Sequence, residues 1–190
     1  MRLFIAINFP DAMRTRLWNE TAPLREVGYP VRWVDADNIH MTVKFLGDVD
    51  GSRIDDVRAG LVKAVGDTKA FYLPLGQFGA FPSPKRPRVL WVGCESLPVL
   101  ELLADAVERE MSQLGFEAER GEGGHAFRPH VTIGRVRRDA RPAALRGLAK
   151  HLEGLEFFEE PPVDSVDLMQ SRLGSQGPRY ERLGAAELSQ

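Results

Sequence analysis

The sequence has little cysteine, little histidine and no long hydrophobic run. One of its 190 residues is cysteine, Cys94, which excludes an internal disulfide and a cluster of cysteine metal ligands. Cys94 lies in the apolar run VLWVGC, where a small buried side chain is expected, and such sparing use of cysteine fits a reducing compartment. No segment approaches the roughly 18 apolar residues of a membrane helix, and the opening MRLFIAINFP lacks the layout of a signal peptide. We therefore expect a cytoplasmic protein without membrane contact.

An excess of charge of one sign is also missing. The chain has 25 basic and 27 acidic residues and a formal net charge of −2. Proteins that coat duplex nucleic acid usually carry a basic excess, so the balance argues against that class. It leaves open a site for a single RNA end, where local charge decides. The hydrophobic fraction of 43% is ordinary, and the length fits one domain over residues 1–190, made of two lobes.

The hydrophobic pattern predicts a mixture of strands and helices. Strands are expected where apolar residues alternate, and helices where they recur every three or four positions. The predicted strands cover 3–8, 31–34, 39–46, 71–78, 89–94, 127–136, 164–171 and 180–188, and the predicted helices cover 11–27, 52–65, 97–114 and 140–152. A proline-rich loop is predicted over Phe81–Pro87. Adjacent strands with intervening helices favour an α+β fold with two mainly antiparallel sheets flanked by helices.

Two of the four histidines begin the same kind of tripeptide. HMT starts at His40 and HVT starts at His130, 90 residues later (130 − 40), and apolar residues follow both. Side chains alternate between the faces of a strand, so each histidine shares a face with the threonine two residues on, Thr42 or Thr132. The two motifs lie at similar places in the two halves. We therefore expect pseudo-twofold symmetry, with both motifs facing a central cleft.

This pattern suits acid–base chemistry at phosphorus. Opening a cyclic phosphodiester with water requires one group to take a proton and another, on the opposite side, to give one. Two imidazoles with ordinary pKa values near 6.5 can hold those complementary states at neutral pH. Two threonine hydroxyls can donate to the phosphate oxygens. A strained cyclic phosphate does not require a metal, and no cluster of metal ligands flanks either motif, so no metal and no cofactor are predicted.

Several longer segments resemble one family. They are MRLFIAINFP, VRWVDADNIH, HMTVKFLG, GAFPSPKRPRVLWVG, FRPHVTIGRV and DLMQSRLGSQGPRYERL. Together they resemble the RNA 2′,3′-cyclic phosphodiesterases, also called 2′-5′ RNA ligases, of the 2H phosphoesterase superfamily. The resemblance covers nearly the whole chain. It implies a bilobal α+β fold, hydrolysis of RNA ends carrying a 2′,3′-cyclic phosphate to a 2′-phosphate, and a reversible 2′-5′ joining of tRNA halves in some members.

The same resemblance implies roles for the motif residues. His40 resembles the proton donor to the departing O3′, and His130 resembles the proton acceptor that activates water. Thr42 and Thr132 resemble the groups that bind the phosphate oxygens. Gly134 stands where the family commonly has a bulkier aliphatic residue, a departure that touches strand packing and not the chemistry.

A phosphate needs a positively charged side chain, and two arginines near the second motif are candidates. Arg128 has the same strand parity as His130, whereas Arg135 has the opposite parity and reaches that face only if a bulge intervenes, although the family often has an arginine there. Lys44 shares the parity of the first motif. The aromatic residues considered for base stacking are Phe4, Phe45, Phe81 and Phe127, and the loop cations considered for an RNA backbone are Lys85, Arg86 and Arg88.

Other functions fit the same residues. Small cyclic nucleotides or 2′-5′-linked oligonucleotides would use the same histidine pair. A module that binds a cyclic phosphate end without turnover would need no proton donor and acceptor, so the paired histidines argue against it. The leading prediction is a monomeric RNA 2′,3′-cyclic phosphodiesterase whose partner is RNA with a cyclic phosphate end, tRNA halves included.

Overall fold

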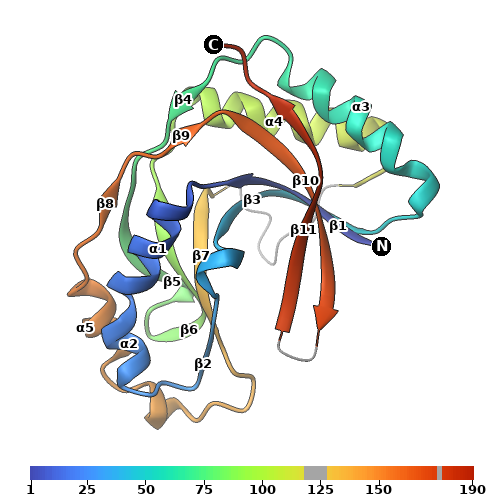
Figure 1. Ribbon diagram of the computed structural model, residues 1–190. Coiled ribbons are helices and arrows are strands. Elements are labelled where there is room, and N and C mark those ends of the chain that lie inside the picture. The colour runs from blue at the N-terminus through green and yellow to red at the C-terminus, as the bar shows by residue number, and fades with distance from the viewer. Residues whose placement is uncertain (118–127, 175–176) are drawn as a thin grey trace.

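One antiparallel sheet organises the computed structural model, which describes residues 1–117, 128–174 and 177–190 (Figure 1). Its strands are β1 (Arg2–Asn8), β2 (Val31–Trp33), β3 (His40–Asp48), β4 (Phe71–Tyr72), β5 (Leu75–Ser83), β6 (Arg86–Cys94), β7 (His130–Val136), β8 (Phe158–Glu159), β9 (Pro162–Val163), β10 (Ser165–Gly174) and β11 (Gly177–Glu187). The main sheet has the order β11-β10-β1-β3-β7-β6-β5-β8, with β2 also paired to β7, while β4 and β9 pair separately.

The helices pack against strands in both halves of this sheet. The α-helices are α1 (Asp11–Glu20), α2 (Ala22–Glu26), α3 (Ile54–Val65), α4 (Pro98–Gln113) and α5 (Leu148–Glu153), and the 3-10 helices are η1 (Ala36–Asn38), η2 (Gly51–Arg53) and η3 (Pro142–Leu145). Helices α3 and α4 pack together and against β3, β10 and β11, whereas α5 packs against β5 (Figure 1). In the part of the chain that the structure describes, no helix is long and apolar enough to cross a bilayer.

The two motif strands meet at the centre of the sheet. Strands β3 and β7 are antiparallel neighbours, and Met41 faces Val131 in their registered pair. From this junction β1, β10 and β11 extend to one side, and β6, β5 and β8 to the other. The predicted α+β class with antiparallel sheets is confirmed, and the two expected sheets join edge to edge at this pair.

One face of the sheet forms the hydrophobic core. Alternate residues such as Ile5 on β1, Leu168 on β10 and Leu90 on β6 are fully buried there together with Met41 and Val131. Each buried side chain of this size stabilises the fold by about 1.5–3 kcal/mol relative to exposure. The opposite face carries a smaller apolar cluster, formed by Phe4, Ala6 and Met169 with Tyr180 packed against it. We call this opposite face the histidine face, because the histidines of both motifs lie on it.

Some predicted boundaries were wrong. The helix expected over 11–27 is divided at Thr21, whose hydroxyl donates to the carbonyl of Trp18 at the end of α1. The helix expected over 140–152 is η3 followed by α5. The loop expected over Phe81–Pro87 is a tight hairpin, because β5 continues to Ser83 and β6 begins at Arg86. Residue 127, where a strand was predicted to begin, lies outside the described residues, and β7 begins at His130.

Candidate active site

The register of β3 and β7 places the four motif side chains on one face. The registered pair joins the middle residues of the two motifs, and both of these point into the core. Moving one residue along each antiparallel strand sets His40 opposite Thr132 and Thr42 opposite His130. All four side chains are half-buried. They form a square with the histidines on one diagonal and the threonines on the other.

A square of this kind suits in-line substitution at phosphorus. Diagonal neighbours on paired strands lie about 7–8 Å apart, which leaves room for one phosphate between them. His40 and His130 would then contact the phosphate from opposite sides. The hydroxyls of Thr42 and Thr132 lie on the other diagonal, and within the described ranges no side-chain group is hydrogen-bonded to either of them. The register therefore gives the two imidazoles opposite positions and leaves the hydroxyls free to donate.

Both strands bulge directly after the threonine. Ala6 of β1 pairs with Thr42 and Ile5 pairs with Lys44, so Val43 is an extra residue in β3. On β7 the extra residue is Ile133, which lies between residues that pair with consecutive positions of β6. Each bulge reverses the alternation of the residues that follow it. The residues directly after each bulge, Lys44 and Phe45 in β3 and Gly134 and Arg135 in β7, therefore lie on the opposite faces from those that simple alternation predicts.

The bulge in β7 carries Arg135 onto the histidine face. Arg135 pairs with Val89, two positions from Trp91, which pairs with Thr132. Its positive charge lowers the pKa values of His40 and His130, so it lies near both imidazoles. The bulge that Arg135 needs in order to reach the face of His130 is therefore present.

Arg128 occupies a different kind of position. It is exposed, and its backbone carbonyl accepts a hydrogen bond from His130 Nδ1. The contact that the structure records for Arg128 is therefore made by its backbone. Arg135 is the arginine whose charge acts on both histidines.

The bulge in β3 turns Lys44 away from the site. Lys44 is buried, with its Nζ 2.7 Å from Glu108 Oε2 on α4 and 3.2 Å from the carbonyl oxygen of Glu117. The expectation that Lys44 shares the face of His40 is wrong, because Val43 adds one residue between them.

Gly134 is enclosed by its neighbours. A Cβ atom at this position would lie 2.7 Å from Val31 Cγ1 and 3.0 Å from Trp33 Cε3, so no side chain fits. The missing aliphatic side chain is replaced by Val31 and Trp33 of β2, which pairs with this part of β7.

Backbone carbonyls fix both imidazole rings in the same way. His40 Nδ1 lies 2.7 Å from the carbonyl oxygen of Asn38, and His130 Nδ1 lies 2.8 Å from that of Arg128. A carbonyl only accepts, so each Nδ1 carries a proton and donates it. Each Nε2 is left as the nitrogen that exchanges protons with a substrate.

Burial makes both imidazoles harder to protonate. It lowers the pKa of His40 to about 4, with a further lowering from the charge of Arg135, while the bond to the Asn38 carbonyl opposes the shift. Burial and the charge of Arg135 also lower the pKa of His130, while the hydrogen bond to the Arg128 carbonyl opposes the shift. An anion between the rings would favour their charged forms. A phosphate substrate would therefore help to protonate the residue that acts as the acid.

Aromatic rings pack against the imidazole rings of both histidines. The ring of His40 lies 5.0 Å from those of Phe4 and Tyr180, and the ring of His130 lies 5.0 Å from that of Phe81. Phe4 is buried, so it supports His40 and is not free to stack on a base. Phe45 is 40% exposed and, together with Arg53 and Phe116, lines a hollow of about 420 Å³.

Sequence reasoning considered Phe4, Phe45 and Phe81 but missed Tyr180 and Trp91 on the same face. The remaining candidate, Phe127, lies outside the described residues.

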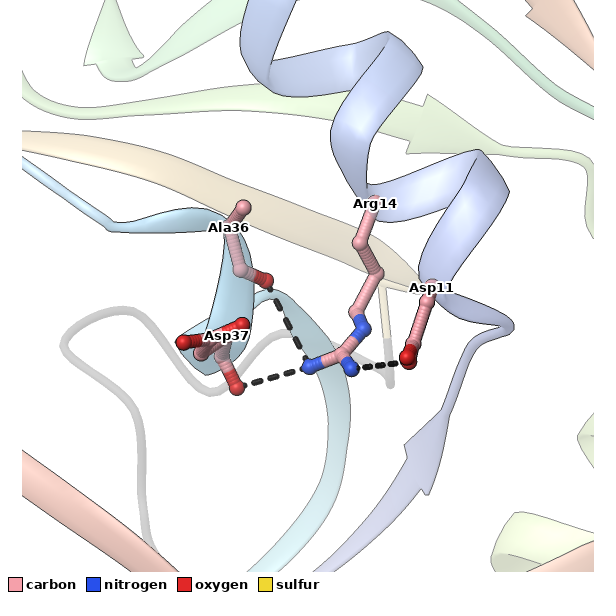
Figure 2. Close-up of polar contacts among 4 residues, drawn as sticks. All are labelled: Asp11, Arg14, Ala36 and Asp37. Atoms are coloured by element: carbon pink, nitrogen blue, oxygen red, sulfur yellow. Dashed lines mark hydrogen bonds and ion pairs between the residues drawn. The ribbon is translucent and has the colours of Figure 1, made fainter.

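Helix α1 braces the turn that leads into the first motif. Arg14 donates to the carbonyl of Asp37 over 2.8 Å and to that of Ala36 over 3.5 Å, while its other terminal nitrogen pairs with Asp11 (Figure 2). These carbonyls belong to η1, which ends at Asn38. The Asn38 side chain also donates to the carbonyl of Pro178 on β11, over 3.1 Å. The carbonyl that orients His40 is therefore held by contacts from two distant segments, which no local pattern in the sequence indicated.

The residues that the structure describes contain no group of three or more histidine, cysteine or acidic side chains arranged to hold a metal ion. The thiol of Cys94 is half-buried, and burial raises its pKa to about 12, which disfavours the reactive thiolate. Among the residues that the structure describes, the imidazoles on the histidine face are those of His40 and His130.

Known proteins share this sequence and this fold. The family model of the 2′-5′ RNA ligase superfamily matches residues 13–174. A Thermotoga maritima protein named RNA 2′,3′-cyclic phosphodiesterase is 32% identical over 184 residues, which cover 96% of this chain and 93% of that protein. A crystal structure of a Thermus thermophilus protein matches with a TM-score of 0.77 and 28% identity, covering 99% of this chain and 98% of that one. Escherichia coli LigT complexed with 3′-AMP matches with a TM-score of 0.71 and 25% identity, covering 100% and 98%.

Proposed function

The chain belongs to the 2′-5′ RNA ligase superfamily, and from this membership we propose how its histidine face works. The protein is a phosphodiesterase that acts on RNA, as the related RNA 2′,3′-cyclic phosphodiesterase of Thermotoga maritima indicates. The proposed reaction is hydrolysis of a 2′,3′-cyclic phosphate at an RNA end to a 2′-phosphate. The observation that supports it best is the diagonal placement of His40 and His130 across one face.

The proposed reaction divides the proton transfers between the two imidazoles. His130 Nε2 takes a proton from water as the water oxygen attacks phosphorus. The bond between phosphorus and O3′ breaks on the opposite side, and His40 Nε2 gives its proton to O3′ as it leaves. The carbonyl bonds at both Nδ1 atoms support these roles, because they keep each Nε2 directed away from the backbone.

Three further groups are proposed to hold the phosphate. Negative charge builds up on its non-bridging oxygens during the attack, and the hydroxyls of Thr42 and Thr132 would donate to them. Arg135 would supply a positive charge, as its effect on both histidines suggests. For Arg128 the proposed role is limited to the backbone carbonyl that orients His130.

The proposed partner is RNA with a cyclic phosphate end, and halves of cleaved tRNA are included in this class. One chain carries both histidines and both threonines, so the proposed working form is a monomer, acting in the cytoplasm where such RNA ends would be processed.

The test is hydrolysis of a short RNA that ends in a 2′,3′-cyclic phosphate, measured with EDTA present. The wild-type protein should release a 2′-phosphate end, and His40→Ala and His130→Ala should each lower kcat by about 10²- to 10⁴-fold. His151→Ala serves as the control, because His151 lies on α5, outside both motif strands, and contacts Tyr29. Undiminished turnover in either motif variant would contradict the proposal.

A further inference from the structure

A buried carboxylate lies on the histidine face, close to the first motif. Asp167 of β10 is 1% exposed and pairs with Ala6 of β1, which in turn pairs with Thr42 of β3. Burying a carboxylate is costly unless hydrogen bonds satisfy its oxygens. Oδ1 accepts from the hydroxyl of Ser165 over 2.9 Å, and Oδ2 accepts from the side-chain nitrogen of Asn8 over 2.6 Å. Neither proton transfer of the proposed reaction uses this carboxylate.

The hydrogen bonds of Asn8 determine which way its amide group points. Its Nδ2 donates to Asp167 Oδ2 and lies 3.3 Å from Met169 Sδ, and a carboxylate oxygen and a thioether sulfur are both acceptors. The Nη1 of Arg182 lies 3.8 Å from the same Oδ2, so donors surround this oxygen. A reversed amide would set its own oxygen against the two acceptors. Asn8 Oδ1 therefore points away from Asp167, and within residues 1–117, 128–174 and 177–190 no donor to it is recorded.

Asn8 is the neighbour of His40 on the adjoining strand. The two residues form a registered pair of β1 and β3, and the Cβ atoms of such a pair lie about 4.5–5.5 Å apart. Asn8, His40 and Thr132 form one row across the sheet, so Asn8 lies on the side of His40 that is turned away from the second motif. Asn8 is half-buried, and part of it remains accessible on that side.

The nucleoside that carries the cyclic phosphate extends over the same side. In the proposed reaction O3′ leaves toward His40, so the ribose and the base of that nucleoside lie beyond His40 and not beyond His130. None of its ribose hydroxyls is free, because O2′ and O3′ are bonded to the phosphorus and O5′ joins the preceding nucleotide. An acceptor of the protein that contacts this nucleoside therefore receives its hydrogen bond from a nitrogen of the base.

We propose that Asn8 Oδ1 accepts a hydrogen bond from the exocyclic amine of this terminal base, and that Asp167 is the positioning residue that keeps the oxygen turned toward it. The proposal rests on the proposed function, which sets the direction in which O3′ leaves. Adenine and cytosine carry an amine at N6 and N4, where guanine and uracil carry a carbonyl oxygen. An amide free to turn would serve both classes of base, whereas an amide held by Asp167 only accepts. The site thus selects an RNA end in adenine or cytosine.

Five substrates that differ only in the terminal base test this selection in the wild-type protein. Short RNAs that end in a 2′,3′-cyclic phosphate on adenosine or cytidine should have kcat/KM values about 3- to 10-fold above those that end on guanosine or uridine, the effect expected of one hydrogen bond. An end on purine riboside, which lacks only the N6 amine of adenosine, should lose the same factor relative to adenosine. These comparisons require no variant, so they do not depend on the folding of one.

Variants then relate the selection to the amide and to the carboxylate. In Asn8→Ala the KM for the adenosine end should rise about 3- to 10-fold with kcat unchanged, while the KM for the uridine end changes by less than about twofold. In Asp167→Asn two amides face each other and either donates, so the Asn8 amide is free to turn and the preference should fall below about twofold. Ser165→Ala is the matched control, because it removes the other hydrogen bond of the same carboxylate and should leave the preference unchanged.

Equal kcat/KM values for the ends in adenosine, cytidine, guanosine and uridine would overturn the proposal, and so would an adenosine end that loses nothing when its N6 amine is removed. A preference that persists in Asp167→Asn, or one that disappears in Ser165→Ala as well, would overturn the positioning role of Asp167. The proposed function fails in a different way, because hydrolysis of every end would then survive in His40→Ala or His130→Ala.

Discussion

The two halves of the histidine face start from one pattern and differ in what surrounds it. Each half has a histidine whose Nδ1 donates to the carbonyl two residues earlier, a threonine on the same face, and a bulge directly after the threonine. The position that follows each bulge on this face is Phe45 in β3 and Arg135 in β7. One arginine therefore acts on both imidazoles, and the halves cannot be interchanged.

Support for the two histidines differs too. His40 is packed between Phe4 and Tyr180, and its carbonyl partner belongs to a turn that Arg14 braces (Figure 2). His130 has Phe81 at its edge. Greater burial explains why the pKa of His40 falls as far as about 4. The repeated motif thus sets the positions of the two imidazoles, while the neighbouring strands set their protonation.

The largest difference expected from this comparison is between the two arginines near the second motif. Arg135→Ala should lower kcat/KM for the cyclic phosphate end by about 10²- to 10³-fold, because a positive charge facing the developing anion is lost. Arg128→Ala should change it by less than about twofold, because the backbone carbonyl that orients His130 remains. Steady-state kinetics of both variants measure this. Equal losses would mean that the bulge does not select Arg135.

A smaller effect is expected at the threonines. Thr42→Val and Thr132→Val should each lower kcat by about 10- to 150-fold, as expected when one hydrogen bond to a charged oxygen is lost. The matched change Thr21→Val serves as the control, because the Thr21 hydroxyl bonds to the carbonyls of α1. A loss confined to one motif threonine would show that a single hydroxyl, and not the diagonal pair, stabilises the phosphate.

The brace on the first motif should have a more modest effect. Arg14→Met frees the carbonyls of η1 and with them the Asn38 carbonyl that orients His40, so kcat should fall about tenfold. The bond to Asn38 raises the pKa of His40, so its loss should also shift the corresponding limb of the pH–rate profile to lower pH. Arg16 lies on the same helix as Arg14 and forms an ion pair with Glu159 of β8, and Arg16→Met should shift neither. An unchanged pH profile in Arg14→Met would restrict Arg14 to a structural role.

The last effect expected is on the pH dependence of stability and not on catalysis. The pKa of His40 is about 4 in the folded protein and near 6.5 when unfolded, so the unfolded chain binds more protons between these values. The stabilisation is therefore complete above pH 6.5 and is lost as the pH falls toward 4, with a limiting slope of about 1.4 kcal/mol per pH unit. Urea unfolding of wild type and His40→Gln across this range checks it. The same slope in both proteins would assign the loss to other groups.

Local alternation predicted which side chains of each motif share a face, because two residues are enough to define parity. It failed beyond the threonines. Val43 and Ile133 are ordinary apolar strand residues, and nothing in them indicates an extra position, since the bulge arises from the register of the neighbouring strands. For this reason simple alternation predicted the wrong face for Lys44, and it allowed Arg135 to reach the histidine face only if a bulge intervened.

Contacts between distant segments could not be predicted from the sequence either. Arg14 and Asn38 lie in different elements, and only the folded chain brings the guanidinium to the turn before His40. Trp91 reads as a core residue in an apolar strand. Its place on the histidine face follows from its pairing with Thr132 and Gly79, which exists only once β6 has paired with β7 and β5.

The division of labour between His40 and His130 is tested most directly by changing the leaving group. A cyclic phosphate whose 3′ bridging oxygen is replaced by sulfur expels a thiolate, which needs no proton from a general acid. His40→Ala should then recover most of the wild-type rate on the sulfur substrate, while His130→Ala should stay as slow on it as on the natural substrate. Recovery by His130→Ala, or by neither variant, would contradict the assignment of His40 as the acid and His130 as the base.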